Sequence, residues 1–184
     1  MRIVAGKHKG RRLVAPAGHD IRPTSDRVRE ALFNLLAHSL DSTGLVDAQV
    51  ADLFCGTGAV GLEALSRGAA HATLVDNGQA AATAARTNIV ALGEERRTTF
   101  LRNDATKPMP RPARPIDFAY LDPPYRLVVA GAVLENLLRS GWLAPDALVC
   151  VELHRKAAFD SPEGFSLEDE RTYGDTRLVF LKNI

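Results

Sequence analysis

The chain has 184 residues, 46% of them hydrophobic, with a formal net charge of +1 and two cysteines. This size suits one well-buried domain, and the absence of a C-x-x-C pair or a histidine cluster argues against a disulfide framework or a zinc site. We therefore expect no bound metal. No run approaches the roughly 18 apolar residues of a membrane span and no signal-peptide core is present, so we also expect a cytoplasmic protein.

Most of the basic charge lies in the first 30 residues. They contain eight Lys and Arg against three acids, a net of +5 that leaves −4 for the remainder. Alternation around Leu13 and Val14 predicts a short hairpin or extended arm over residues 1–20. Such an arm could lie along phosphates, or it could be a solvated, fraying terminus. Its basic side chains are those of Lys7, Lys9, Arg11 and Arg12.

A helix is expected next, because residues 23–25 form a helix-start signal, Pro-Thr-Ser. An apolar stripe on this helix should pack on a sheet. The stripe consists of Val28, Ala31, Leu32, Leu35 and Leu36. Arg22, Arg27 and Arg29 lie off the stripe, where they could meet RNA or the carboxylate of a ligand, or simply belong to a solvated surface.

Beyond residue 50 the chain alternates between short apolar runs and amphipathic segments. Strands are expected at about residues 51–54, 72–76, 98–102, 117–121 and 147–153, and helices at about 62–67, 78–92 and 128–139. This alternation is typical of an α/β protein with a doubly wound, mostly parallel sheet. Residues 171–181 predict two strands around a Gly174-Asp175 turn, which adds a C-terminal antiparallel strand. We expect a single domain, 1–184, with a basic arm at 1–20 and an α/β core at 21–184.

The first strand runs into a glycine-rich turn. Gly56, Gly58 and Gly61 satisfy G-x-G-x-x-G between a strand and a helix, a pattern that lets a ligand approach the backbone closely. Asp76 ends the next strand about 20 residues beyond the first glycine, where an acid can hold the hydroxyls of a ribose. Both NAD and S-adenosylmethionine carry such a ribose, so the glycines alone do not separate the two cofactors.

Two further acids bear on that choice. Asp52 ends the first strand, where a carboxylate would repel a pyrophosphate but suits the ammonium group of an amino acid, which favours S-adenosylmethionine. Alternatively, Asp52 accepts hydrogen bonds from the amides of the glycine turn. Asp104 follows the third strand and could accept from an adenine amino group, or it could serve as a turn or helix-cap residue.

The segment Asp122-Pro123-Pro124-Tyr125 follows the fourth strand. A carboxylate and a proline carbonyl can both accept hydrogen bonds from a planar exocyclic amine, and the prolines stiffen the backbone that presents them. Tyr125 could stack on the base. The alternative is a proline turn that merely closes a buried strand.

In this order of motifs the chain resembles the class I S-adenosylmethionine-dependent methyltransferases of the amino-methylating D/N-PPY kind. Within that group, residues 22–34, 52–58, 62–68 and 173–176 resemble the bacterial 16S rRNA guanine-N2 methyltransferase family. The resemblance implies a Rossmann-like fold, S-adenosylmethionine as cofactor, and methylation of N2 of guanine 966 of 16S rRNA in the small ribosomal subunit or its assembly intermediate. Cys55 departs from the alanine or other small residue expected in relatives.

The same resemblance assigns residue roles. Asp122, Pro123 and Tyr125 match the amine-holding catalytic motif. The positions that match the cofactor lining are Asp52, Phe54, Gly56, Thr57, Gly58, Asp76 and Asp104. The candidates for contact with rRNA are Lys7, Lys9, Arg11, Arg12, Arg22 and Arg27. The expected mechanism is an in-line displacement that needs neither a metal nor a covalent enzyme intermediate.

Three other functions remain open. An N6-adenine methyltransferase acting on DNA or RNA would share every motif, so the choice of guanine N2 depends on the family resemblance alone. A nicotinamide-dependent oxidoreductase would explain the glycines but not the Asp-Pro-Pro-Tyr segment. An RNA-binding assembly factor without turnover would explain the basic arm but not an intact acid at position 122.

Overall fold

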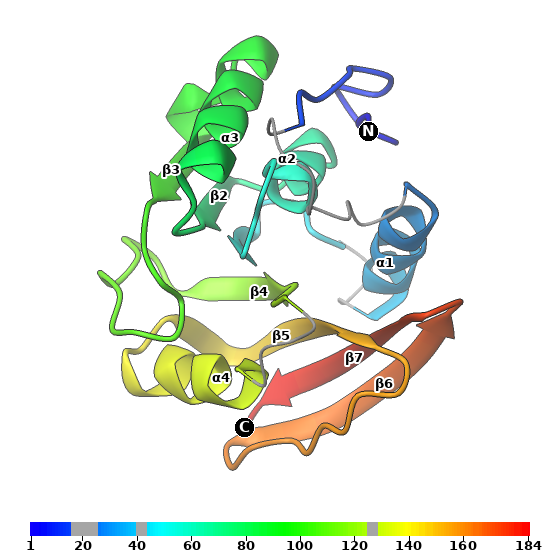
Figure 1. The fold of residues 1–184 in the computed structure, drawn as a ribbon, viewed down its shortest axis with the longest axis vertical. Coiled ribbons are helices and arrows are strands. Elements are labelled where there is room, and N and C mark those ends of the chain that lie inside the picture. The colour runs from blue at the N-terminus through cyan, green and yellow to red at the C-terminus, as the bar shows by residue number, and fades with distance from the viewer. Residues whose placement is uncertain (16–25, 40–43, 125–128) are drawn as a thin grey trace.

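The computed structural model describes residues 1–15, 26–39, 44–124 and 129–184. Two of the predicted site residues, Arg22 and Tyr125, lie outside these ranges. Within them the chain forms one seven-stranded sheet with helices on both faces (Figure 1).

The strands follow the order β3-β2-β1-β4-β5-β7-β6 across the sheet. Their bounds are β1 Gln49–Leu53, β2 His71–Val75, β3 Thr98–Leu101, β4 Ile116–Leu121, β5 Leu143–His154, β6 Phe165–Tyr173 and β7 Thr176–Asn183. The first five are parallel, whereas β7 pairs antiparallel with β5 and with β6. The predicted doubly wound sheet with antiparallel C-terminal strands is therefore confirmed.

The helices are α1 Asp26–Ser39, α2 Ala59–Ser66, α3 Gln79–Leu92 and α4 Ala130–Arg139, with a short 3₁₀ turn at Glu95–Arg97. Apolar side chains of α1, α2 and α3 share one core cluster on one face of the sheet, and those of α4 belong to the cluster on the other face. On α1, Val28, Leu32 and Leu36 are buried at intervals of four residues, as the apolar stripe predicts.

The order of the strands places a switch point at β1. The chain leaves β1 toward β2 on one side, and it returns to add β4 on the other side. In open α/β sheets the connections diverge at such a point, and ligands bind in the crevice outside the carboxyl ends of the strands. The carboxyl ends of β1 and β4 are therefore where this fold offers a site.

The basic segment at the N-terminus forms a hairpin that packs on the domain. Ile3 donates its N–H to the carbonyl of Arg11 at 2.9 Å and accepts from the N–H of Gly10 at 2.8 Å. Ile3 is fully buried and Leu13 nearly so, and both belong to the core cluster that includes α2. The predicted hairpin is confirmed, and the alternative of a fraying terminus does not hold for residues 1–14.

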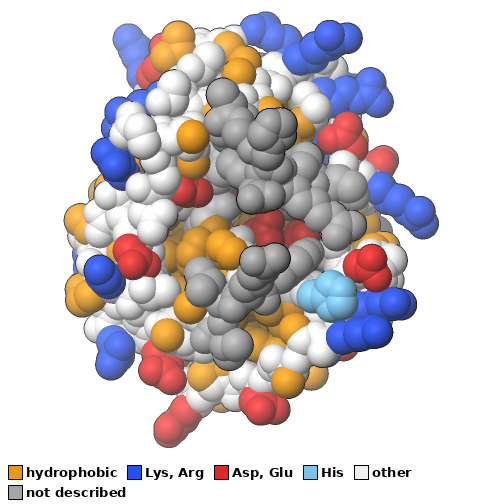
Figure 2. All heavy atoms as spheres, in the orientation of Figure 1, with side chains coloured by type: hydrophobic (Ala, Val, Ile, Leu, Met, Phe, Trp, Pro, Cys, Tyr) orange, Lys and Arg blue, Asp and Glu red, His pale blue; other side chains and the backbone are white. Residues whose placement is uncertain are grey.

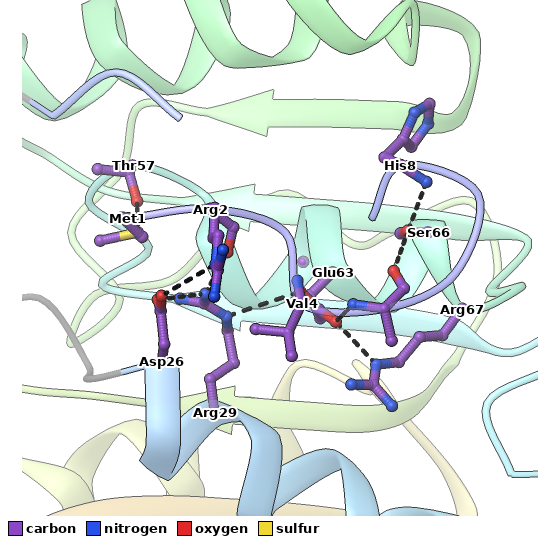
Figure 3. A network of polar contacts seen from close by, with 12 residues as sticks. Met1, Arg2, Val4, His8, Asp26, Arg29, Thr57, Glu63, Ser66 and Arg67 are labelled. Atoms are coloured by element: carbon purple, nitrogen blue, oxygen red, sulfur yellow. Dashed lines mark hydrogen bonds and ion pairs between the residues drawn. The ribbon is translucent and has the colours of Figure 1, made fainter. Parts of the chain in front are cut away.

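A buried carboxylate on α2 holds this hairpin (Figure 3). Glu63 accepts the N–H of Val4 at 2.7 Å and that of Ala5 at 2.9 Å. The guanidinium groups of Arg29 and Arg67 lie 3.7 and 2.9 Å from its oxygens. Backbone donors and flanking cations together offset the cost of burying the Glu63 charge.

Arg29 is fully buried, although its position off the apolar stripe suggested a surface residue. It donates to the carbonyl of Arg2 and to the carboxylate of Asp26, the latter at 2.8 Å. His8 is also buried and lies 2.5 Å from Glu94, which Arg97 contacts as well. The hairpin is thus anchored by buried polar groups at two places.

Substitution of the hairpin glycines tests this docking. A Cβ atom on Gly6 would lie 1.9 Å from the carbonyl oxygen of Ser66, whereas one on Gly10 would meet nothing within 4 Å. Both glycines have positive φ, +77° and +84°, so both alanine variants incur a left-handed backbone cost of about 1–2 kcal/mol. We expect Gly6→Ala to lower the free energy of unfolding in urea by at least about 2 kcal/mol more than the matched Gly10→Ala does. Equal losses would contradict close docking.

Candidate active site

The turn between β1 and α2 has an unusual backbone. Phe54 has φ +61°, a left-handed conformation that bulky residues rarely adopt, and Gly56 and Gly58 follow with φ 53° and 76°. The N–H of Cys55 donates to the carbonyl of Val75 at 3.0 Å and thereby fixes the turn to the end of β2. Strained residues of this kind persist where the surrounding structure holds them, and they cluster at ligand sites.

Two of the glycines are required by packing. A Cβ atom on Gly61 would lie 2.3 Å from Leu74 Cδ2, and one on Gly58 would lie 2.8 Å from Leu74 Cδ1. The start of α2 therefore lies directly against β2, with no room for a side chain between them. This contact is the helix packing that the third glycine of G-x-G-x-x-G provides.

Asp52 lies beneath the turn and is 2% exposed. Its side chain accepts the N–H of Gly61 at 2.9 Å. This is the hydrogen bond that the alternative interpretation predicted, in which Asp52 binds the amides of the turn. Burial raises the pKa of Asp52 to about 7, with the charge of Asp76 adding to the increase and the hydrogen bond from Gly61 opposing it. Direct contact between Asp52 and a ligand stays a prediction.

Asp76 holds the glycine turn from the end of β2. One carboxylate oxygen accepts the N–H of Gly56 at 3.0 Å and the other accepts the N–H of Gly78 at 2.8 Å. The side chain is partly exposed at the sheet edge. Asp76 is therefore positioned beside the turn in the place where an acid can meet the ribose of a bound nucleotide.

Asp104 forms a local turn after β3. Its Oδ1 accepts both the N–H of Thr106 at 3.0 Å and the hydroxyl of Thr106 at 2.6 Å, and these bonds lower the pKa of Asp104. Lys107 lies 3.9 Å from Oδ2. Asp104 therefore acts as a turn residue, which is one of the two roles that the sequence left open. Its role as an acceptor for an adenine amino group stays a prediction.

Asp122 and Pro123 lie beside the glycine turn. Leu53 is opposite Leu121 in the β1–β4 pair, and the N–H of Asp122 donates to the carbonyl of Leu53 at 3.3 Å. Asp122 is partly exposed, whereas Pro123 is buried. The two motifs are therefore adjacent at the switch point, although they are far apart in the sequence. The register of the two strands, and not proximity along the chain, brings them together.

The four strand ends lie in the order β3-β2-β1-β4. The predicted cofactor-lining turn, Asp76, Asp104 and Asp122 consequently gather at one edge of the sheet. In the orientation of Figure 1, a patch of acidic side chains lies near the centre of the molecular face, whereas the Lys and Arg side chains lie around its margin together with other acids (Figure 2).

The predicted RNA-contacting residues lie apart from this edge. Lys7, Lys9, Arg11 and Arg12 are exposed on the hairpin, and Arg27 is exposed on α1. Two of them have contacts within the protein: Arg11 donates to the carbonyl of Ala91 at 2.5 Å, and Lys7 lies 3.5 Å from Glu94. The hairpin is nevertheless tied to the site, because Asn88 bonds both the backbone of Val14 and the carbonyl of Thr57.

The described ranges contain neither a cluster suited to a metal nor a helix suited to a membrane. No group of three or more His, Cys, Asp and Glu side chains there could hold a metal ion. Among the helices that the structure describes, none is long and apolar enough to cross a membrane.

Two buried charged residues near the site have contacts that the sequence did not predict. Glu152 on β5 is 4% exposed and accepts a hydrogen bond from the hydroxyl of Tyr120. Arg29 is fully buried, and its positive charge lowers the pKa of Asp52. A single acid within the apolar run 147–153 was the available signal for Glu152, since charged residues are rarely buried without a partner.

Comparison with known proteins adds a family. Residues 1–182 match the family model described as conserved hypothetical protein 95. The chain is 37% identical to ribosomal RNA small subunit methyltransferase D of Escherichia coli, over 95% of this chain and 85% of the relative. It is 31% identical to the protein of the same name in Haemophilus influenzae, over 95% of this chain and 89% of the relative.

Solved structures agree with the sequence matches. The protein HI0767 of Haemophilus influenzae superposes with a TM-score of 0.79 at 28% identity, over 100% of this chain and 98% of that chain. The hypothetical protein TTHA0928 of Thermus thermophilus superposes with a TM-score of 0.77 at 26% identity, over 98% of each chain.

The burial of Asp52 predicts a pH dependence of stability. In the folded protein the carboxyl keeps its proton up to about pH 7, whereas the unfolded chain releases it near about pH 3.9, so the folded state binds more protons between these values. The contribution of Asp52 to stability is therefore full below about pH 4 and is lost as the pH rises toward 7, by up to about 4 kcal/mol. Asp52→Asn removes this titration while keeping an acceptor for Gly61. Urea denaturation from about pH 4 to pH 7 should show the wild type losing stability relative to the variant, and parallel curves would contradict the prediction.

Proposed function

The chain belongs to the family described as conserved hypothetical protein 95, and we propose that it transfers a methyl group from S-adenosylmethionine to the exocyclic N2 of guanine 966 of 16S rRNA. The observation that carries this proposal is the hydrogen bond from Asp122 to Leu53, which joins the amine-holding motif to the glycine turn. The curated relatives named rRNA small subunit methyltransferases support the choice of substrate. We further propose that residues 1–184 act as a single methyltransferase domain.

The residues at the edge of the sheet fit S-adenosylmethionine, which supplies an activated methyl group when bound. The glycine turn offers partly exposed backbone at Gly56, and Asp76 lies beside it to meet ribose hydroxyls. Asp52 supports the turn from beneath, and in its ionised form its carboxylate would favour an ammonium group over a phosphate. The positive charge of that ammonium group would in turn lower the raised pKa of Asp52. The proposed lining is completed by Phe54, Thr57, Gly58 and Asp104.

Asp122 and Pro123 hold the acceptor amine in this proposal. The lone pair of an exocyclic amine is delocalised into the base, so the nitrogen must be oriented before it reacts. The carboxylate of Asp122 and the carbonyl of Pro123 accept the two amine hydrogens. Tyr125, which lies outside the described residues, is assigned to stacking on the base by its place in the motif. The proton released from the methylated nitrogen leaves through Asp122 or through water.

The exposed basic residues of the hairpin suit the phosphates of rRNA. Such contacts position a substrate and make its affinity depend on salt, but they carry no base identity. The partner is the small ribosomal subunit or its assembly intermediate, and the target base must be unpaired or flipped out to present its amino edge. Arg22, outside the described residues, and Arg27 on α1 are proposed to extend this contact.

A methyl-transfer assay tests the proposed function. Small subunits from cells that lack the enzyme are incubated with the protein and S-adenosylmethionine carrying a labelled methyl group, and the digested rRNA is analysed for modified nucleosides. We expect the label in N2-methylguanosine from a single site. Label in N6-methyladenosine, or equal methylation of duplex DNA, would overturn the assignment.

Two substitutions should separate the roles of the acids. Asp122→Ala should lower the single-turnover rate by at least about 100-fold with little change in cofactor affinity, because it removes an acceptor for the amine. Asp76→Ala should instead weaken cofactor binding by at least about 10-fold, because it removes the ribose contact and the support of Gly56. Rapid-quench kinetics and calorimetry measure the two quantities. An unaltered rate in Asp122→Ala would refute its role, and unchanged binding in Asp76→Ala would remove it from the ribose site.

A further inference from the structure

A second buried carboxylate lies beside Asp122. In the parallel pair of β4 and β5, Tyr120 is opposite Cys150 and Leu121 is opposite Val151, so the next step in this register sets Asp122 beside Glu152. Side chains alternate across a strand, which places Tyr120, Asp122 and Glu152 on the same face of the sheet. Asp122 directly follows β4 at the switch point, and Glu152, near the carboxyl end of β5, is therefore part of the same edge.

The hydroxyl of Tyr120 holds Glu152 in place. Tyr120 and Glu152 are 1% and 4% exposed, and the hydroxyl donates to Oε2 of the carboxylate. Burial raises the pKa of Tyr120 above its ordinary range, and the charges of Glu152 and Asp122 both add to the increase. Burial also raises the pKa of Cys150, and the charges of the same two carboxylates raise it further. Tyr120 thus remains a hydrogen-bond donor, and it orients Glu152 as an acceptor close to Asp122.

We infer that Glu152 determines the choice of base by accepting the N1–H of the target guanine while Asp122 and Pro123 hold its N2 amine. This inference rests on the proposed function. Guanine presents N1–H and N2–H side by side on its Watson–Crick edge, and carboxylate oxygens accept from both. Adenine presents a lone pair at N1, and a carboxylate oxygen facing that lone pair would be repelled because both groups are hydrogen-bond acceptors. The amine-holding motif alone fits either base, and Glu152 supplies the distinction.

The analogue 2-aminopurine gives a direct test. It keeps the exocyclic amine of guanine but carries a lone pair at N1 in place of N1–H. Small subunits are reconstituted with 16S rRNA that carries guanine or 2-aminopurine at the target position, and kcat/KM for methyl transfer is measured. The wild type should prefer guanine by about 10- to 100-fold, the discrimination expected of one well-placed contact to a base edge.

Glu152→Gln should reverse part of this preference. The side-chain amide can donate to the N1 lone pair, so the rate with 2-aminopurine should rise several-fold while the rate with guanine falls at least about 10-fold. Cofactor affinity should not change. A merely structural role would lower both rates together, and an unchanged ratio between the two bases would overturn the inference.

Two further variants complete the experiment. Asp146→Asn removes a carboxylate from the distant end of β5, where the side chain is 76% exposed, and asparagine tolerates the local φ of 59°. It should leave both rates unaltered. Tyr120→Phe keeps Glu152 but removes the hydroxyl that orients it, so the rate with guanine should fall several-fold, and an unaffected rate would count against the inference even if Glu152→Gln did not fold. Failure of the wild type to methylate guanine would overturn the proposed function itself.

Discussion

Leu53 and Leu121 lie opposite one another in the parallel pair of β1 and β4, and the hydrogen bond from Asp122 to Leu53 continues that pair by one step. Everything at the candidate site depends on this register. It sets the glycine turn, which follows β1, beside Asp122 and Pro123, which follow β4, at the place where the connections of the sheet diverge. Since a shift by one residue would turn every side chain to the opposite face, the buried cores on both faces of the sheet maintain the register.

Much of the fold and part of the site could be predicted from local patterns. The alternation of apolar runs with amphipathic segments predicted the parallel sheet, and the turn at Gly174-Asp175 predicted the final antiparallel pair. The candidate site residues at the ends of β1 to β4 could be named because glycine turns and acids after strands have known places in this architecture. The hairpin was predicted too, although its depth in the core was not, because burial of Ile3 depends on α2 and not on its own neighbours.

The buried polar partners could not be found in this way. A lone histidine in a basic segment does not indicate a buried partner, yet His8 contacts Glu94, which is 86 residues away in the sequence. Arg29 is on the polar side of α1 by its spacing, yet the hairpin covers it and gives it a carbonyl to bind. Glu152 is paired with Tyr120 only because β4 and β5 are neighbours. In each case a polar or charged group became tolerable in the interior through a partner that folding alone supplies.

The position of Met1 determines where tags and labels can be attached to the protein. Its thioether accepts a hydrogen bond from the hydroxyl of Thr57 at 3.3 Å, so the start of the chain touches the glycine turn (Figure 3). A peptide joined before Met1, such as an affinity tag, would begin close to this contact with the turn. Ile184 at the other end is 79% exposed. Purification handles and fluorescent labels therefore belong after Ile184, where they leave the turn undisturbed.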